Sequence, residues 1–179
     1  MAMEGTEGHG ARLRAFEEAI RAQGFDTAFV PASDEVPYDV LAVALGGDEA
    51  GDAVHQLELS FIPGMEEQLE GAALLQCFVH LPADVPAAAE DGLRRLIALL
   101  NGRLPLVGFG WLEAEEMLCF RHAMMLPPDD RTATPLVVQA VWMIGYLLSV
   151  FADTVVEVAT GARAVDEALR DNPFRSVFE

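Results

Sequence analysis

Three histidines, His55, His80 and His122, fall in stretches that have the residue pattern of β-strands. Imidazole nitrogens are common zinc ligands, so a metal centre across a sheet is conceivable. The spacing matches no zinc-binding pattern, and no short-range Cys/His pair supports one. The sequence therefore favours ordinary strand histidines.

Carboxylates are the second group that could do chemistry. The segment GGDEAGD offers Asp48, Glu49 and Asp52, but it lacks the alternate-position oxygens of a helical calcium loop, which favours a solvated turn. The adjacent pair Asp129 and Asp130 could serve as acid and base. Because this pair precedes a long helical segment, we interpret it as loop solvation and helix capping.

Nucleophiles that need an amine are excluded, because all 11 basic residues are arginine. A Schiff-base lysine and a Walker-A phosphate loop both require that amine. Cys77 and Cys119 lie in apolar alternating runs, which predicts buried free thiols, with a disulfide between neighbouring strands as the alternative. No Ser or Cys lies in a nucleophile-elbow sequence. We expect no catalytic site and no cofactor.

The charge of the chain limits the kinds of partner. There are 29 acidic and 11 basic residues, giving a formal net charge of −18. This charge repels nucleic acid and acidic lipid headgroups and suits basic or amphipathic partners. The N-terminal sequence MAMEGTEGHG does not resemble a signal peptide, so we expect a cytoplasmic protein.

Helical and extended patterns alternate along the chain. Helices are expected at 11–24, 86–101, 135–158 and 162–170, and strands at 38–46, 54–63, 73–82, 104–112 and 117–127, with a short extended piece at 26–30. Few helices are available as crossovers, so the sheet is antiparallel. The sequence predicts an α+β fold of about five strands with helices packed on one face, in the order helix-βββ-helix-ββ-helix. We expect one domain over 1–179, with a flexible N-terminus at 1–8 and a helical appendage at 162–179.

The last two strands form a hairpin around the turn EAEE. One register pairs the apolar side chains consistently on a single face. Its pairs are Leu112 with Met117, Trp111 with Leu118 and Phe109 with Phe120. In this register Trp111 should be buried against the helices.

The segment PLVVQAVWMIGYLLSVFADTVVEV, residues 135–158, is the most apolar in the chain. An aliphatic stripe runs through Val137, Val141, Ile144, Leu148, Phe151, Val155 and Val158. A second stripe, with polar and amphipathic side chains, runs through Gln139, Trp142, Tyr146, Ser149, Asp153 and Glu157. Because a helix in lipid has no reason to gather polar groups on one line, the pattern favours a helix packed on the sheet over a membrane span.

The passage from Leu93 to Pro127, with LLNGRLPLVGFGWLEAEEMLCFRHAMMLP at its end, resembles the YbjN-like family of bacterial sensory transduction regulators. That family is related in fold to the class I type III secretion chaperones. The chain departs from those chaperones in its length, its extra short helix and its Phe-containing tail. The resemblance implies a small, acidic, often dimeric protein that binds other polypeptides and has no cofactor.

We therefore expect a non-enzymatic protein-binding adaptor or chaperone-like protein. The alternative is a small-ligand-binding protein or an enzyme with an unrecognised pocket between the sheet and the helices. The helices at 86–101 and 135–158 carry more apolar surface than one sheet can cover, which predicts a homodimer or another protein partner. The candidate contact residues are Leu93, Leu96, Leu100, Trp142 and Tyr146.

Overall fold

The computed structural model describes residues 4–34, 36–46, 55–64 and 69–171, and the structural statements below concern these residues. The acidic segment with Asp48, Glu49 and Asp52 lies outside the described residues, as do residues 1–3 of the predicted flexible N-terminus and 172–179 of the predicted appendage.

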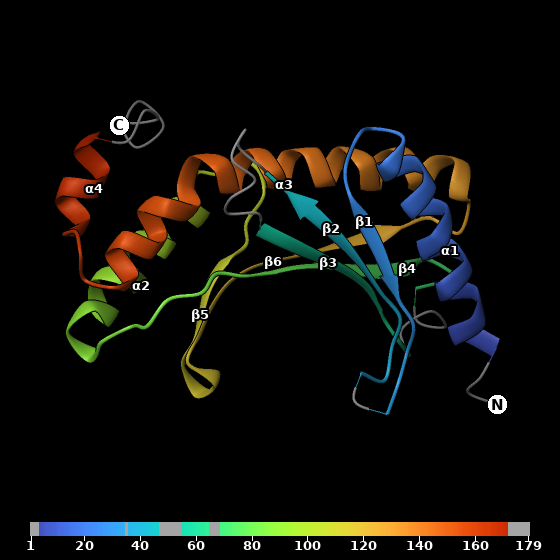
Figure 1. The fold of residues 1–179 in the computed structure, drawn as a ribbon, viewed down its shortest axis with the longest axis horizontal. Helices are drawn as coiled ribbons and strands as arrows, with labels where there is room; N and C mark the ends of the chain where they lie inside the picture. Colours follow the sequence, from blue (N-terminus) through green and yellow to red (C-terminus); the bar gives the residue numbers. More distant parts are fainter. Residues whose placement is uncertain (1–3, 35, 47–54, 65–68, 172–179) are drawn as a thin grey trace. The chain divides into compact units, whose positions relative to one another are not determined.

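The described chain forms four α-helices, one short 3-10 helix and six strands (Figure 1). The helices are α1 (Glu4–Arg21), α2 (Ala87–Asn101), α3 (Asp130–Ala159) and α4 (Val165–Asp171), with the 3-10 helix η1 at Glu113–Glu115. The strands are β1 (Thr27–Val30), β2 (Val40–Leu45), β3 (His55–Ile62), β4 (Ala73–His80), β5 (Phe109–Leu112) and β6 (Met117–Leu126).

The strands form one sheet in the order β1-β2-β3-β4-β6-β5. The predicted α+β class with an antiparallel sheet is confirmed. The sheet has six strands rather than about five, because the short extended piece at 26–30 pairs with β2 as an edge strand.

By compactness the chain divides into two units, one of residues 1–79 and 122–145 and the other of residues 80–121 and 146–179. The first unit holds α1, β1 to β3 and most of β4, together with the C-terminal part of β6 and the N-terminal half of α3. The second unit holds α2, β5, the start of β6, the C-terminal half of α3, and α4.

In the first unit, α1 buries the side chains of Leu13, Phe16 and Ile20 completely. The helix begins at Glu4, so it includes most of the segment that was expected to be flexible. Its Arg12 donates from Nε to Asp130 Oδ1 at 2.7 Å and from Nη2 to the carbonyl of Pro127 at 2.8 Å. These bonds connect α1 to the start of α3.

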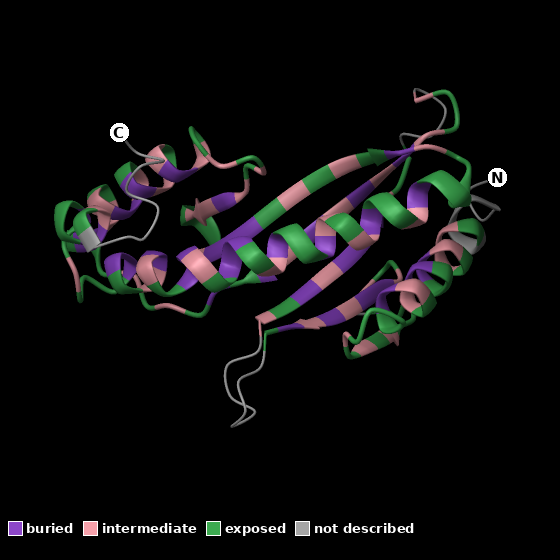
Figure 2. Cartoon of the chain, turned by 90° about the horizontal axis from the view of Figure 1, so that it is seen from above, coloured by how far each residue is buried: buried purple, intermediate pink, exposed green. Residues whose placement is uncertain are grey.

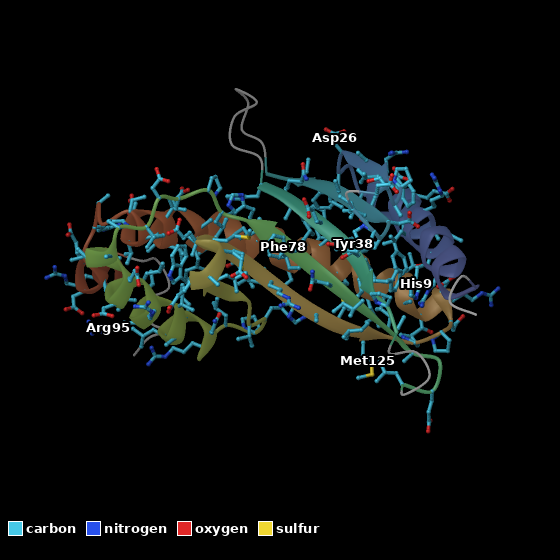
Figure 3. The ribbon with its side chains drawn as sticks, turned by 90° about the horizontal axis from the view of Figure 1, so that it is seen from below. His9, Asp26, Tyr38, Phe78, Arg95 and Met125 are labelled. Carbon is cyan, nitrogen blue, oxygen red and sulfur yellow. The ribbon has the colours of Figure 1, made fainter. Side chains whose placement is uncertain are left out.

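The strands of the first unit alternate between a buried and a more exposed face. In β3, Leu57, Leu59 and Phe61 are buried. The opposite face carries side chains such as Phe78 and Met125 (Figure 3). Glu58 pairs with Phe78 across β3 and β4, so this opposite face mixes polar and apolar groups.

In the second unit, the β5–β6 hairpin has the predicted register. Phe109 pairs with Phe120, Trp111 with Leu118 and Leu112 with Met117. Asn101, at the end of α2, accepts from the backbone N–H of Phe109 at 3.1 Å and donates to its carbonyl at 2.7 Å. This side chain satisfies the backbone of Phe109 as a neighbouring strand would, and thereby fixes α2 against β5.

The burial predicted for Trp111 is only partly right, because its side chain is half-buried. The turn explains the difference. β5 ends one residue later, at Leu112, and the chain then enters η1 and the left-handed residue Glu116, with φ 48°. Trp111 therefore lies near the end of its strand, where one side of the indole remains uncovered.

Helix α3 begins with the capping arrangement that the sequence predicted. The side chain of Asp129 accepts from the backbone N–H of Thr132 at 3.2 Å and from its hydroxyl at 2.7 Å. The hydrogen bond from the Thr132 side chain lowers the pKa of Asp129, so this cap stays ionised at neutral pH.

Helix α3 is the one described helix that is long and apolar enough to cross a membrane by length and composition. In this fold the helix buries its aliphatic stripe instead. The buried members include Val137, Val141, Ile144, Leu148, Phe151, Val155 and Val158. Figure 2 shows buried and exposed positions alternating along α3, as expected for a helix with one face on a sheet.

Candidate partner-binding surface

The leucines of α2 are not available to a partner. Leu93, Leu96 and Leu100 are at most 1% exposed and belong to the core of the second unit. Their spacing places them on the side of α2 that packs against β5 and α4. The structure therefore removes these three residues from the predicted contact.

The outer side of α3 remains exposed along several turns. We call Leu136, Trp142, Met143 and Tyr146 the outer stripe. Their exposed fractions are 45%, 50%, 39% and 52%. Trp142 and Tyr146 were predicted as contact residues, and the structure leaves both accessible. Exposed large apolar side chains that share one helix face are typical of a binding surface.

Trp142 is oriented by a neighbour that the sequence did not indicate. The ring of Phe25, which follows α1, meets the indole of Trp142 edge to face, with 4.7 Å between ring centroids and 66° between ring planes. Such aromatic pairs contribute about 0.5–1.5 kcal/mol beyond their buried area. The contact holds the indole partly in place before any partner binds.

Charged residues are confined to the ends of α3. Between Thr132 and Ala152 the helix contains no Asp, Glu or Arg. Asp129 and Asp130 stand at its beginning, and Asp153 and Glu157 follow the outer stripe. Arg131 is exposed beside them, and Asp130 is paired with Arg12. The outer stripe is therefore an uncharged surface with charges of both signs near its start and carboxylates beyond its end.

Two members of the outer stripe, Leu136 and Met143, were missed in the sequence. Their spacing of seven residues places them on the same side of a helix, so the sequence did indicate that they share a face. The pattern alone did not distinguish this side from the buried stripe, because both sides of α3 are apolar. Phe25 gave no signal, since it stands alone after the glycine turn.

The second unit has an open hollow of about 1060 Å³. Its lining includes Trp111 from β5, the loop from Pro82 to Pro86, and the carboxylates of Glu113 and Glu116. The indole Nε1 of Trp111 is buried and has no hydrogen-bond partner. The hollow is a candidate site for the small ligand of the alternative hypothesis.

The two thiols are poor nucleophiles. Both cysteines are buried and free, as predicted. Burial raises the pKa of Cys77 to about 12, and burial also raises the pKa of Cys119 against a smaller opposing effect of Arg121. Since the thiolate is the reactive form, neither residue is activated for nucleophilic chemistry at neutral pH.

The predicted strand histidines do not form a cluster with other ligands. His55 lies in β3, His80 ends β4, and His122 lies in β6. Within the described part of the chain, no three His, Cys, Asp or Glu side chains gather in a way that could hold a metal ion.

Comparisons with protein-family models, with curated proteins and with solved structures found no match to this chain. The resemblance to the YbjN-like family stays a hypothesis based on residues 93–127.

Proposed function

We propose that this chain is a non-enzymatic protein-binding protein, an adaptor or chaperone-like protein of the YbjN and secretion-chaperone type. The outer stripe of α3 is the observation that carries the proposal. It presents an aromatic anchor, Trp142, beside flexible and branched apolar side chains on a regular helix. Interfaces between proteins are enriched in such aromatic and methionine side chains.

The partner of the outer stripe is another polypeptide in this proposal. A second copy of the chain is the competing hypothesis, with Trp142 and Tyr146 in a two-fold contact. The net charge of −18 on each copy opposes such pairing, and added salt would weaken that repulsion.

Site-specific photo-crosslinking in the native host tests the proposal. A photoreactive phenylalanine analogue is placed at position 143, and a matched control carries it at position 107. Val107 lies outside α3 and is an apolar site more exposed than Met143, at 55% against 39%. We expect a discrete crosslinked protein from position 143 and a much lower yield from position 107.

A second variant shows whether the crosslink depends on the surface. Adding Trp142→Ser should abolish the crosslink from position 143, because the anchor is lost, whereas adding Val107→Ser should leave it unchanged. Equal yields from positions 143 and 107, or a crosslink that survives Trp142→Ser, would contradict a specific docking surface on α3.

The hollow beside Trp111 supports the alternative function, binding of a small ligand in the second unit. The indole N–H of Trp111 is buried and lacks an acceptor. A ligand could supply this acceptor after a small rearrangement. A Trp142→Phe variant leaves Trp111 as the single tryptophan. Mass spectrometry of the protein purified under native conditions, together with Trp111 emission before and after denaturation and refolding, would reveal a co-purifying molecule.

A further inference from the structure

The outer stripe also indicates which kind of polypeptide it would bind. We infer that it accepts the apolar face of a cationic amphipathic helix. This inference rests on the proposed function and goes further by naming the chemistry of the partner. Three features of the described residues support it: the length of the stripe, the type of its side chains and the position of the charges.

The length of the stripe suits a helical partner. Leu136 and Tyr146 are ten residues apart on one helix, which corresponds to about 15 Å at 1.5 Å per residue. A partner helix presents apolar side chains at intervals of three and four residues, so about three of its turns would cover this length. Helix-on-helix packing of this kind brings the two axes to about 8–10 Å.

The side chains of the stripe suit apolar contacts rather than hydrogen-bonded recognition. Trp142 provides a large rigid ring that Phe25 already supports. Met143 provides an unbranched thioether that adapts to the shape of a partner. The only polar side chain between Leu136 and Trp142 on this exposed side is Gln139, and it carries no charge.

The charge of the first unit indicates which charge the partner should carry. The first unit, which contains Leu136, Trp142 and Met143, has 17 acidic and 4 basic residues. Three of its four arginines are already engaged: Arg12 with Asp130, Arg21 with Glu17, and Arg14 over the ring of Phe29. The fourth, Arg131, is exposed in the first turn of α3. Asp26 is exposed and directly follows Phe25, the residue that touches Trp142.

A partner with basic residues beside its apolar face would therefore meet an uncharged centre, with the carboxylate of Asp26 nearby, in a unit of negative net charge. A second copy of this chain would bring the same negative charge, and anionic lipid would do so as well. A cationic amphipathic helix would match both the apolar side chains of the stripe and the negative charge of the unit that carries it.

Fluorescence of the full chain tests this inference. A Trp111→Phe variant keeps Trp142 as its single tryptophan, and circular dichroism verifies that it is folded. Three synthetic peptides share one apolar leucine face and differ in the polar face, which carries lysine, glutamine or glutamate. We expect a saturable blue shift of Trp142 emission with the lysine peptide and an affinity at least about tenfold higher than for the glutamine peptide. The glutamate peptide should produce no shift.

Salt and a surface variant separate specific docking from general attraction to an acidic protein. Raising the salt from about 50 to about 300 mM should weaken the lysine peptide's affinity several-fold, because the screening length shortens. The substitutions Leu136→Ser and Met143→Ser together should reduce the affinity at least about tenfold, whereas Val107→Ser should not change it. An affinity that is unaffected by the double substitution would overturn the inference.

The remaining outcomes identify the other occupants. Equal binding of the lysine and glutamine peptides overturns the cationic preference and leaves the proposed function intact. Self-association that tightens with salt and shifts Trp142 emission without peptide identifies a second copy and overturns the inference. A shift with phosphatidylcholine vesicles but not with the lysine peptide identifies a membrane surface. If none of the three peptides shifts Trp142 emission but the crosslink at position 143 persists, only the inference is overturned. If that crosslink is also absent, the proposed function is overturned as well.

Discussion

Helices α2 and α3 both carry regular apolar stripes, but they use them differently. On α2, the apolar residues Leu93, Leu96 and Leu100 form one buried side, and the charged residues Arg94 and Arg95 lie outside it. Helix α3 has the same kind of buried side and, in addition, an uncharged outer side that contains Trp142. An apolar stripe is available to a partner only when a second element of the fold does not already cover it.

The largest difference should appear in chemical accessibility, between the buried thiol of Cys77 in β4 and the thioether of Met143 in the outer stripe. Cys77 is buried in β4, and burial raises its pKa from the ordinary value of 9.0 to about 12. At pH 8 this lowers its thiolate population roughly a thousandfold. We expect Cys77 to react with a disulfide reagent only after unfolding, whereas mild peroxide should oxidise Met143 in the folded protein.

The pH dependence has a defined sign. Because the folded state raises the pKa of Cys77, the folded state binds more protons than the unfolded state between about pH 9 and 12. The contribution of this thiol to stability is complete below about pH 9 and is lost as the pH rises through that window. Rapid labelling of Cys77 in the native protein at pH 8 would contradict its burial.

The next largest difference should appear in the stability of variants on α2 and α3. Leu96→Ala on α2 should lower the free energy of unfolding by about 2–5 kcal/mol, because it removes a fully buried side chain. Trp142→Ala on α3 should cost only about 1 kcal/mol, since half of this side chain is exposed and its main contact is Phe25. Urea melts of the two variants measure both values, and a larger cost for Trp142→Ala would reverse the comparison.

A smaller difference is expected in the fluorescence quenching of the two tryptophans. In single-tryptophan variants, acrylamide should quench Trp142 a few-fold more efficiently than Trp111, because Trp111 is less exposed than Trp142 and its Nε1 is inaccessible. Acrylamide is neutral, so the negative charge of the protein does not bias the result. Equal quenching constants would indicate that the outer stripe is covered in solution.

Much of the fold could be predicted from the sequence, and the β5–β6 hairpin shows why. Side chains alternate between two faces along a strand, so a single register brings Trp111 opposite Leu118 and Phe109 opposite Phe120. The short strand β1 was harder to identify as part of the sheet. Its four residues, Thr27–Val30, contain too little periodicity to distinguish a paired strand from an extended connection.

The candidate surface could be predicted only in part. Periodicity identified the second side of α3 and its residues Trp142 and Tyr146, but it treated the leucines of α2 in the same way. Whether a stripe is covered depends on elements that are distant in the sequence, such as β5, which packs on α2. Phe25 shows the same limit, because its contact with Trp142 joins residues far apart in the chain.

NMR spectra of the methionine methyl groups can show whether a peptide contacts the outer stripe of α3. Met143 lies in the stripe, and Met125 in β6 is 60% exposed and serves as an internal control on the same chain. On addition of the lysine-bearing amphipathic peptide, we expect a saturable shift of the Met143 methyl resonance while the Met125 resonance stays in place. A shift of Met125 with an unchanged Met143 resonance would show that the peptide binds elsewhere and not on α3.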